Sequence, residues 1–83
     1  MVCMLAACAR NPFRSDAEEC RYLLDRAYAE LDTAKAVNPS AAADIARAAG
    51  LISAATVQRQ FDKQRNCIDK AERARDLLAP YRG

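Results

Sequence analysis

Apolar residues recur along most of this chain at the spacing of an α-helix. After residue 15 one side carries, in helical register, Cys20, Leu24, Ala27, Leu31 and Ala34. Ser15 and Glu18 have the spacing of a capping box, in which a serine and a later glutamate satisfy the first backbone donors of a helix. Pro39 disfavours helix at the residue before it. The pattern therefore predicts a first helix over residues 16–37.

The second half of the chain predicts a short helix followed by a long one. Ser40 can begin a segment that ends at Gly50, because glycine is favoured in the left-handed conformation that terminates helices. A further helix stops at Pro80, and its apolar side carries Val57, Phe61, Gln64, Ile68, Ala71 and Leu78. We therefore expect helices over about residues 40–50 and about residues 53–79.

Two of the four cysteines, Cys20 and Cys67, lie on or beside the apolar sides of the two long helices. If residues 40–79 formed one unbroken helix, they would be separated by about 13 Å along the hairpin, too far for a disulfide. A short crosswise helix brings them opposite each other, in an antiparallel register where Phe61 meets Ala27. We expect an all-α antiparallel helical hairpin joined by this crosswise helix, with one disulfide. The unbroken helix is the alternative.

Such a disulfide has consequences for stability and for compartment. It would close a loop of roughly 47 residues and stabilise the fold by about 4 kcal/mol in the chain-entropy treatment. Disulfides persist in the periplasm and outside the cell. The other interpretation is a pair of buried free thiols in a reducing cytosol.

The composition argues against enzymatic chemistry. The chain has no His, no glycine-rich phosphate loop and no CxxC pair. Its charged residues stand at helix-surface spacing, which is typical of a solvated surface. We expect no catalytic residue, no metal site and no cofactor. The 13 basic and 11 acidic residues give a net charge of +2, which argues against nucleic-acid binding.

Near the start of the chain, Leu5-Ala6-Ala7-Cys8 resembles the lipobox of bacterial lipoprotein signal peptides. The resemblance implies that Cys8 becomes the lipid-modified first residue of a mature protein and anchors it to a membrane. The stretch before Cys8 is shorter than a complete signal and contains no Lys or Arg. The alternative is a short apolar tail on a cytoplasmic protein.

The same resemblance divides the chain and suggests an address. Residues 1–8 would be a signal-peptide remnant with the lipobox, residues 9–14 a tether, and residues 15–83 a single helical domain. Lipoproteins kept in the inner membrane often carry Asp at the position of Ala9. Ala9 therefore implies the outer membrane of the bacterial cell envelope, facing the periplasm.

Two surface features point to a protein partner. Tyr22, Ala29 and Ala36 form a second, weaker stripe on the first helix, and Arg59, Lys63 and Lys70 make the last helix somewhat basic. The plainer interpretation is a solvated surface of good helix formers and charges.

The function expected from these features is a lipid-anchored periplasmic helical protein-interaction module, such as an adaptor, a pilotin-like protein or a scaffold. The alternatives are a small inhibitor or immunity protein, and a cytosolic helical adaptor with free thiols.

Overall fold

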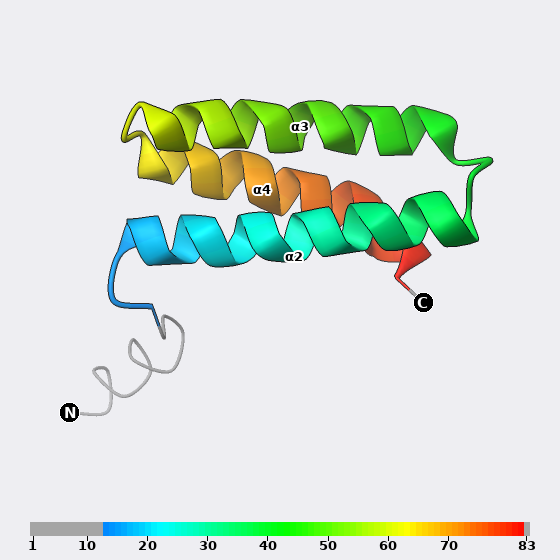
Figure 1. Ribbon diagram of the computed structural model, residues 1–83, viewed down its shortest axis with the longest axis horizontal. Coiled ribbons are helices and arrows are strands. Elements are labelled where there is room, and N and C mark those ends of the chain that lie inside the picture. Colours follow the sequence, from blue (N-terminus) through cyan, green and yellow to red (C-terminus); the bar gives the residue numbers. More distant parts are fainter. Residues whose placement is uncertain (1–12, 83) are drawn as a thin grey trace.

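The computed structural model describes residues 13–82, which form three α-helices running up, down and up (Figure 1). Helix α2 spans Asp16–Val37, α3 spans Ala42–Gln60 and α4 spans Gln64–Leu78, followed by the 3-10 helix η1 at Ala79–Tyr81. No β-strand occurs among the described residues. The predicted all-α fold is confirmed. The signal remnant predicted over residues 1–8, with Cys8, lies outside the described residues.

Helix α2 begins and ends where the sequence predicts. The Oγ of Ser15 accepts a hydrogen bond of 3.2 Å from the backbone N–H of Glu18. The Glu18 carboxylate in turn accepts a bond of 2.7 Å from the N–H of Arg14. The first bond satisfies a backbone donor in the first turn of the helix, whereas the second is donated by the residue before the N-cap. The C-cap is Asn38, directly before Pro39.

The predicted break at Gly50 is wrong. Residues 42–60 form one continuous helix, and Gly50 has no positive φ. The crosswise helix predicted over residues 40–50, and the helix start predicted near residue 53, are therefore replaced by α3. A helical glycine costs only about 1 kcal/mol, which is less than the continuous helix gains by burying apolar side chains such as Ile52.

The chain reverses instead between α3 and α4, inside the helix predicted over residues 53–79. Asp62 has a left-handed backbone with φ of 65°. The N–H of Lys63 donates to the carbonyl of Gln58 at 2.8 Å, and the N–H of Asp62 donates to the carbonyl of Arg59 at 3.0 Å. This pair of bonds is a Schellman motif, which satisfies the last carbonyls of a helix and ends it.

The predicted disulfide between Cys20 and Cys67 is present, with the Cα atoms 5.7 Å apart and both residues fully buried. The predicted antiparallel direction of its helices is wrong, because the bond joins α2 to α4 and these run the same way (Figure 1). The predicted packing of Phe61 over Ala27 is also wrong, since Ala27 is buried while Phe61 is 70% exposed. A disulfide fixes one point between two helices, and one point is compatible with either direction.

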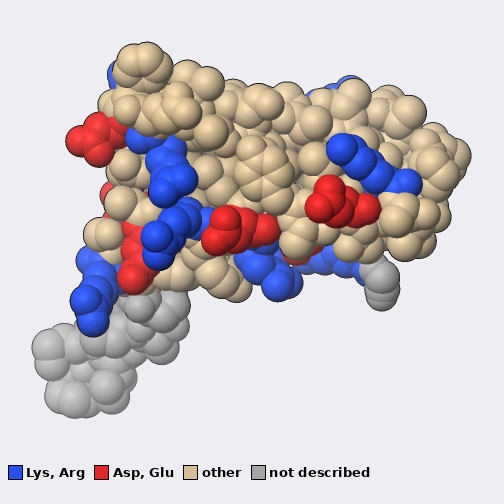
Figure 2. All heavy atoms as spheres, in the orientation of Figure 1, with Lys and Arg blue, Asp and Glu red and all other residues tan. Residues whose placement is uncertain are grey.

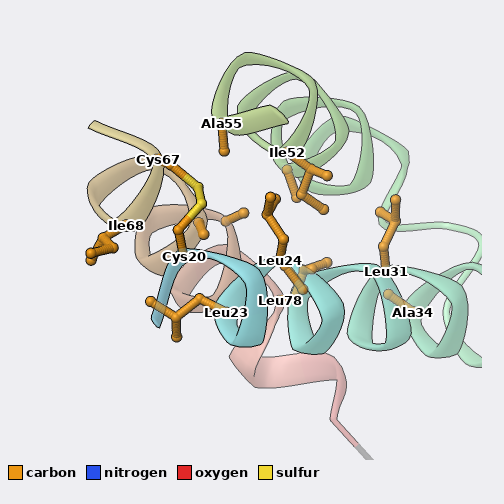
Figure 3. Packing of buried hydrophobic residues seen from close by; sticks show 14 residues of the cluster. Cys20, Leu23, Leu24, Leu31, Ala34, Ile52, Ala55, Cys67, Ile68 and Leu78 are labelled. Atoms are coloured by element: carbon orange, nitrogen blue, oxygen red, sulfur yellow. A yellow bond between two sulfur atoms is a disulfide. The ribbon is translucent and has the colours of Figure 1, made fainter. Parts of the chain in front are cut away.

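The core lies where the three helices meet (Figure 3). Leu24 of α2 lies between Ile52 of α3 and Leu78 of α4, close to the disulfide. Much of the remaining core is alanine, fully buried at Ala27, Ala34, Ala48, Ala55, Ala71 and Ala74. Small side chains let the helix backbones approach one another closely.

Candidate protein-interaction surface

A carboxylate is buried between α2 and the C-terminal part of the chain. Glu30 is 8% exposed, and its two oxygens accept hydrogen bonds of 3.0 and 2.9 Å from Nε and Nη2 of Arg75. The Nε of Arg82 lies 3.1 Å from Oε2 of Glu30. Two arginines on one carboxylate offset the cost of removing it from water, so this cluster fastens α4 and the chain end to α2.

The contacts within this cluster shift the pKa values of Glu30 and Arg75 so that both groups stay charged. Burial by itself would raise the pKa of the Glu30 carboxyl, but the hydrogen bonds and charge of Arg75, with the charges of Arg82 and Arg26, lower it overall. The hydrogen bonds to Glu30 raise the pKa of Arg75. Glu30 is thus a fixed anion at neutral pH, which is a structural role rather than that of a group exchanging protons.

A second polar contact ties the chain end to the start of α3. The hydroxyl of Tyr81 donates a hydrogen bond of 2.7 Å to Oδ2 of Asp44. This bond raises the pKa of Tyr81, because ionisation would place an anion beside a carboxylate. Both polar contacts therefore join parts of the same chain.

The hollows of the surface are lined by ordinary surface side chains. One is lined by Phe13, Glu18, Arg21, Tyr22 and Asp25, and another by Leu23, Glu72, Arg75, Asp76 and Arg82. Neither lining contains a His, Cys or Ser. In residues 13–82 there is no group of three or more His, Cys, Asp or Glu that could hold a metal ion. Surfaces that could contact a partner are a further kind of candidate.

The side of α3 that points away from the bundle is almost uncharged. We define the outer face of α3 by the residues that recur there at intervals of three or four, namely Ala46, Gly50, Ser53, Ala54, Val57 and Phe61. All are exposed except Ala54, which is half-buried, and Val57 and Phe61 are 46% and 70% exposed. In Figure 2 the upper part, where α3 lies, is nearly free of charge, whereas charged side chains gather below it.

Gly50 lies in the middle of the outer face of α3, and neither its backbone conformation nor any contact within the chain explains why a glycine stands there. Its backbone is helical, and a Cβ added to it would meet no atom within 4 Å. Neither conformation nor packing therefore requires glycine here, although glycine costs a helix about 1 kcal/mol relative to alanine. A notch that its own chain leaves open is suited to the close approach of another backbone.

Of the six residues predicted as a partner surface, Tyr22, Ala29 and Ala36 lie exposed along one side of α2. The Tyr22 ring packs on Phe13, with the ring centroids 5.2 Å apart. Tyr22 nevertheless remains 46% exposed, so all three residues of the stripe are open to solvent.

The three basic candidates lie elsewhere. Arg59 is exposed in the last turn of α3, Lys63 is exposed in the turn that follows, and Lys70 is half-buried on α4. Arg59 lines a hollow with Ala17, Glu18, Arg21 and Gln64, which places it near the start of α2. Ala36 lies at the other end of α2, so the six candidates are spread over the bundle rather than gathered on one face.

The sequence pattern does not predict the outer face of α3, because Gly50 is typical of a helix end and Val57 and Phe61 have the spacing of core residues. One signal could have found it. No charged residue stands between Arg47 and Arg59, a stretch of three helical turns. A helix that lacks charge all round is typically covered on all sides.

No helix within residues 13–82 is long and apolar enough to cross a membrane. Comparisons of the chain with protein-family models, with curated proteins and with solved structures found no match.

Proposed function

We propose that this chain is a small helical protein-interaction module of the bacterial envelope, facing the periplasm and held at the outer membrane by lipid on Cys8. Its partner binds the outer face of α3. The observation that carries this proposal is that face itself, where Val57 and Phe61 are exposed on a surface without charge. Exposed apolar patches of this kind on soluble domains mark contact sites.

Two features support the compartment. The Cys20–Cys67 disulfide is fully buried in the core, and such bonds persist in oxidising compartments such as the periplasm. The lipobox-like Leu5-Ala6-Ala7-Cys8 suggests the same address by an independent route. A lipid-anchored module needs a fold that is stable without a large core, and the disulfide supplies that stability.

The mode of contact follows from the shape of the surface. A convex helix with small residues in its middle accepts another helix, because small side chains let two backbones approach. We therefore expect the partner to present a helix to α3, with apolar residues at helical spacing.

Lipid labelling tests the anchor. The full chain, expressed in a Gram-negative host, should incorporate labelled fatty acid and sediment with outer membranes. Cys8→Ser should abolish both, whereas the matched control Cys3→Ser should change neither. Equal labelling of the Cys8→Ser variant and the wild type contradicts the anchor.

Photocrosslinking tests the surface. A photoreactive amino acid at Val57, on the outer face of α3, should give defined crosslinked products in cells. The same group at Ala29, which is also exposed but lies on α2, should give none above background. Crosslinking from Ala29 alone would move the contact to α2 and contradict the proposed surface.

A further inference from the structure

We propose that the outer face of α3 binds a second copy of itself, with the two α3 helices antiparallel about a two-fold axis between Ser53 and Ala54. This names the partner of the surface proposed above and rests on that surface. It does not depend on the lipid anchor.

The face is complementary to itself only in this direction. Its first half is small, with Ala46 and Gly50, and its second half is large, with Val57 and Phe61. In the antiparallel register Phe61 of one copy lies opposite Ala46 of the other, and Val57 lies over the open notch at Gly50. Ser53 and Ala54 meet at the centre. Each large side chain therefore finds a small one, as interdigitating helix surfaces require.

Charge does not decide the direction, because Arg47 borders the small half of the face, whereas the end of α3 beyond the large half carries Arg59 and Lys63 as well as Asp62, all exposed. The antiparallel arrangement therefore turns Arg47 of one copy toward charges of both signs in the other. A parallel pair would instead set Arg47 against its own copy, Phe61 against Phe61 and Gly50 against Gly50, which combines repulsion with a void.

The extent of the face predicts a weak dimer. From Ala46 to Phe61 it is roughly 22 Å long at the rise of an α-helix. A strip of one helix width buries on the order of 400 Å² per copy, about half of what a standard stable interface buries. We expect a dissociation constant in the range of about 10–100 µM. Tethering both copies to one membrane would raise their effective concentration, so that a dimer of this affinity would form there.

A lipid surface is a poorer occupant. Helices that lie in a membrane interface border their apolar side with several Lys and Arg. Helix α3 carries only Arg47 and Arg59, and Arg59 lines a hollow near the start of α2.

Sedimentation velocity of the full chain tests the assembly, with Cys3→Ser and Cys8→Ser present so that the Cys20–Cys67 bond holds the only cysteines. Between about 5 and 500 µM the sedimentation coefficient should rise from that of a monomer to that of a dimer. Gly50→Leu should weaken the dimer at least tenfold, because it fills the notch. It leaves the monomer folded, since leucine favours helix and the added Cβ meets no atom. The matched control Ala29→Leu, on α2, should change nothing.

Crosslinking in the same background tests the direction. Ser53→Cys lies beside the two-fold axis and should form an intermolecular disulfide by itself. Val57→Cys should not, but a mixture of Val57→Cys and Gly50→Cys chains should form mixed dimers. Crosslinking of Val57→Cys alone would show a parallel pair and overturn the proposed register.

Further outcomes of these experiments would decide whether the outer face of α3 binds a second copy or another partner. A chain that stays monomeric throughout, or a dimer that Gly50→Leu leaves intact, overturns the proposal. A monomer that crosslinks from Val57 to a different protein in cells assigns the face to a foreign helix, and binding to vesicles of anionic lipid assigns it to a membrane. Loss of fatty-acid labelling with an intact dimer would contradict the anchor alone, so the two proposals fail separately.

Discussion

Helices α3 and α4 bury apolar sides in the same core, but the sides that they expose to solvent differ in charge. The exposed side of α4 carries Arg65, Asp69, Glu72, Arg73 and Asp76. Asp69 and Arg73 pair at 3.4 Å, and Arg65 lies 3.7 Å from Asp16 of α2. The exposed side of α3 has Gly50, Val57 and Phe61 instead. The exposed side of α4 is therefore charged and well solvated, whereas the outer face of α3 is typical of a helix that packs against a further neighbour.

The two helices are also held differently. A disulfide and the ion cluster around Glu30 join α4 to α2. Helix α3 is held mainly by apolar packing of residues such as Ile52 and Ala55, with the Tyr81–Asp44 hydrogen bond at its start. Covalent and ionic ties therefore fix α2 to α4, and α3 lies against this pair.

The largest expected effect comes from removing the covalent tie of α4. The double variant Cys20→Ala/Cys67→Ala should lower the free energy of unfolding by about 4 kcal/mol, since the bond spans 47 residues of the unfolded chain. Guanidinium chloride midpoints would measure this. Reductant should lower the wild-type midpoint to that of the double variant and leave the variant unchanged. A variant as stable as the oxidised protein would show that packing alone holds α4.

The next effect separates the inner and outer sides of α3. Ile52 is 1% exposed, so Ile52→Ala should leave a cavity and cost about 3 kcal/mol. Val57→Ala, on the outer face of the same helix, should cost less than about 0.5 kcal/mol in the monomer. Urea unfolding at low protein concentration compares the two. Equal losses would mean that Val57 is also packed within the chain, which would remove the contrast between α3 and α4.

The ionic tie of α4 should respond to acid. The pKa of Glu30 is lower in the folded protein than its ordinary value of 4.5, so its ionised form stabilises the fold. This contribution is fully present above that ordinary value and is lost as the pH falls through the lowered pKa. Arg75→Met should lower stability by about 2 kcal/mol at neutral pH, because it removes two charged hydrogen bonds.

Thermal unfolding across the acid range checks this linkage. The wild type should lose more stability on acidification than Glu30→Gln, which has no carboxyl to protonate. Parallel acid profiles of these two proteins would show that Glu30 does not couple folding to pH.

Local signals in the sequence were enough to place α2 and the disulfide. Ser15, Glu18 and Pro39 act through bonds or clashes with their immediate neighbours, so the sequence alone predicts both ends of the helix. Cys20 and Cys67 could be paired because both lie on apolar sides. The compartment suggested by that pair stays a prediction.

The topology and the candidate surface depended on competing energies that a local pattern does not rank. Gly50 offered a helix end worth about 1 kcal/mol, and burial on both sides of it outweighed that preference. The real turn uses Asp62 in a conformation that few non-glycine residues adopt. Because the pattern predicts the turn at the wrong residues, it also predicts the wrong direction for α4. The contact of Glu30 with Arg75, 45 residues away, and the outer face of α3 were therefore not visible.

The smallest expected effect concerns the turn that separates α3 from α4. Asp62 has a left-handed backbone, which glycine adopts without the clash of a Cβ. Asp62→Gly should therefore stabilise the protein by about 0.5 kcal/mol, after allowing for the greater freedom of glycine in the unfolded chain. Loss of the 3.1 Å hydrogen bond from Gln64 to Asp62 limits the gain.

The control for this turn is Asp62→Ala, which keeps the Cβ, removes the polar side chain and should destabilise by about 1 kcal/mol. Both variants would be compared with the wild type by chemical denaturation under identical conditions. The opposite test, Gly50→Ala, should stabilise the monomer, because its helical position has no use for glycine within the chain. If alanine were as favourable as glycine at position 62, the reversal between α3 and α4 could not depend on a left-handed residue. The contrast would then disappear between Gly50, whose helical position does not require glycine, and Asp62, whose left-handed position favours it.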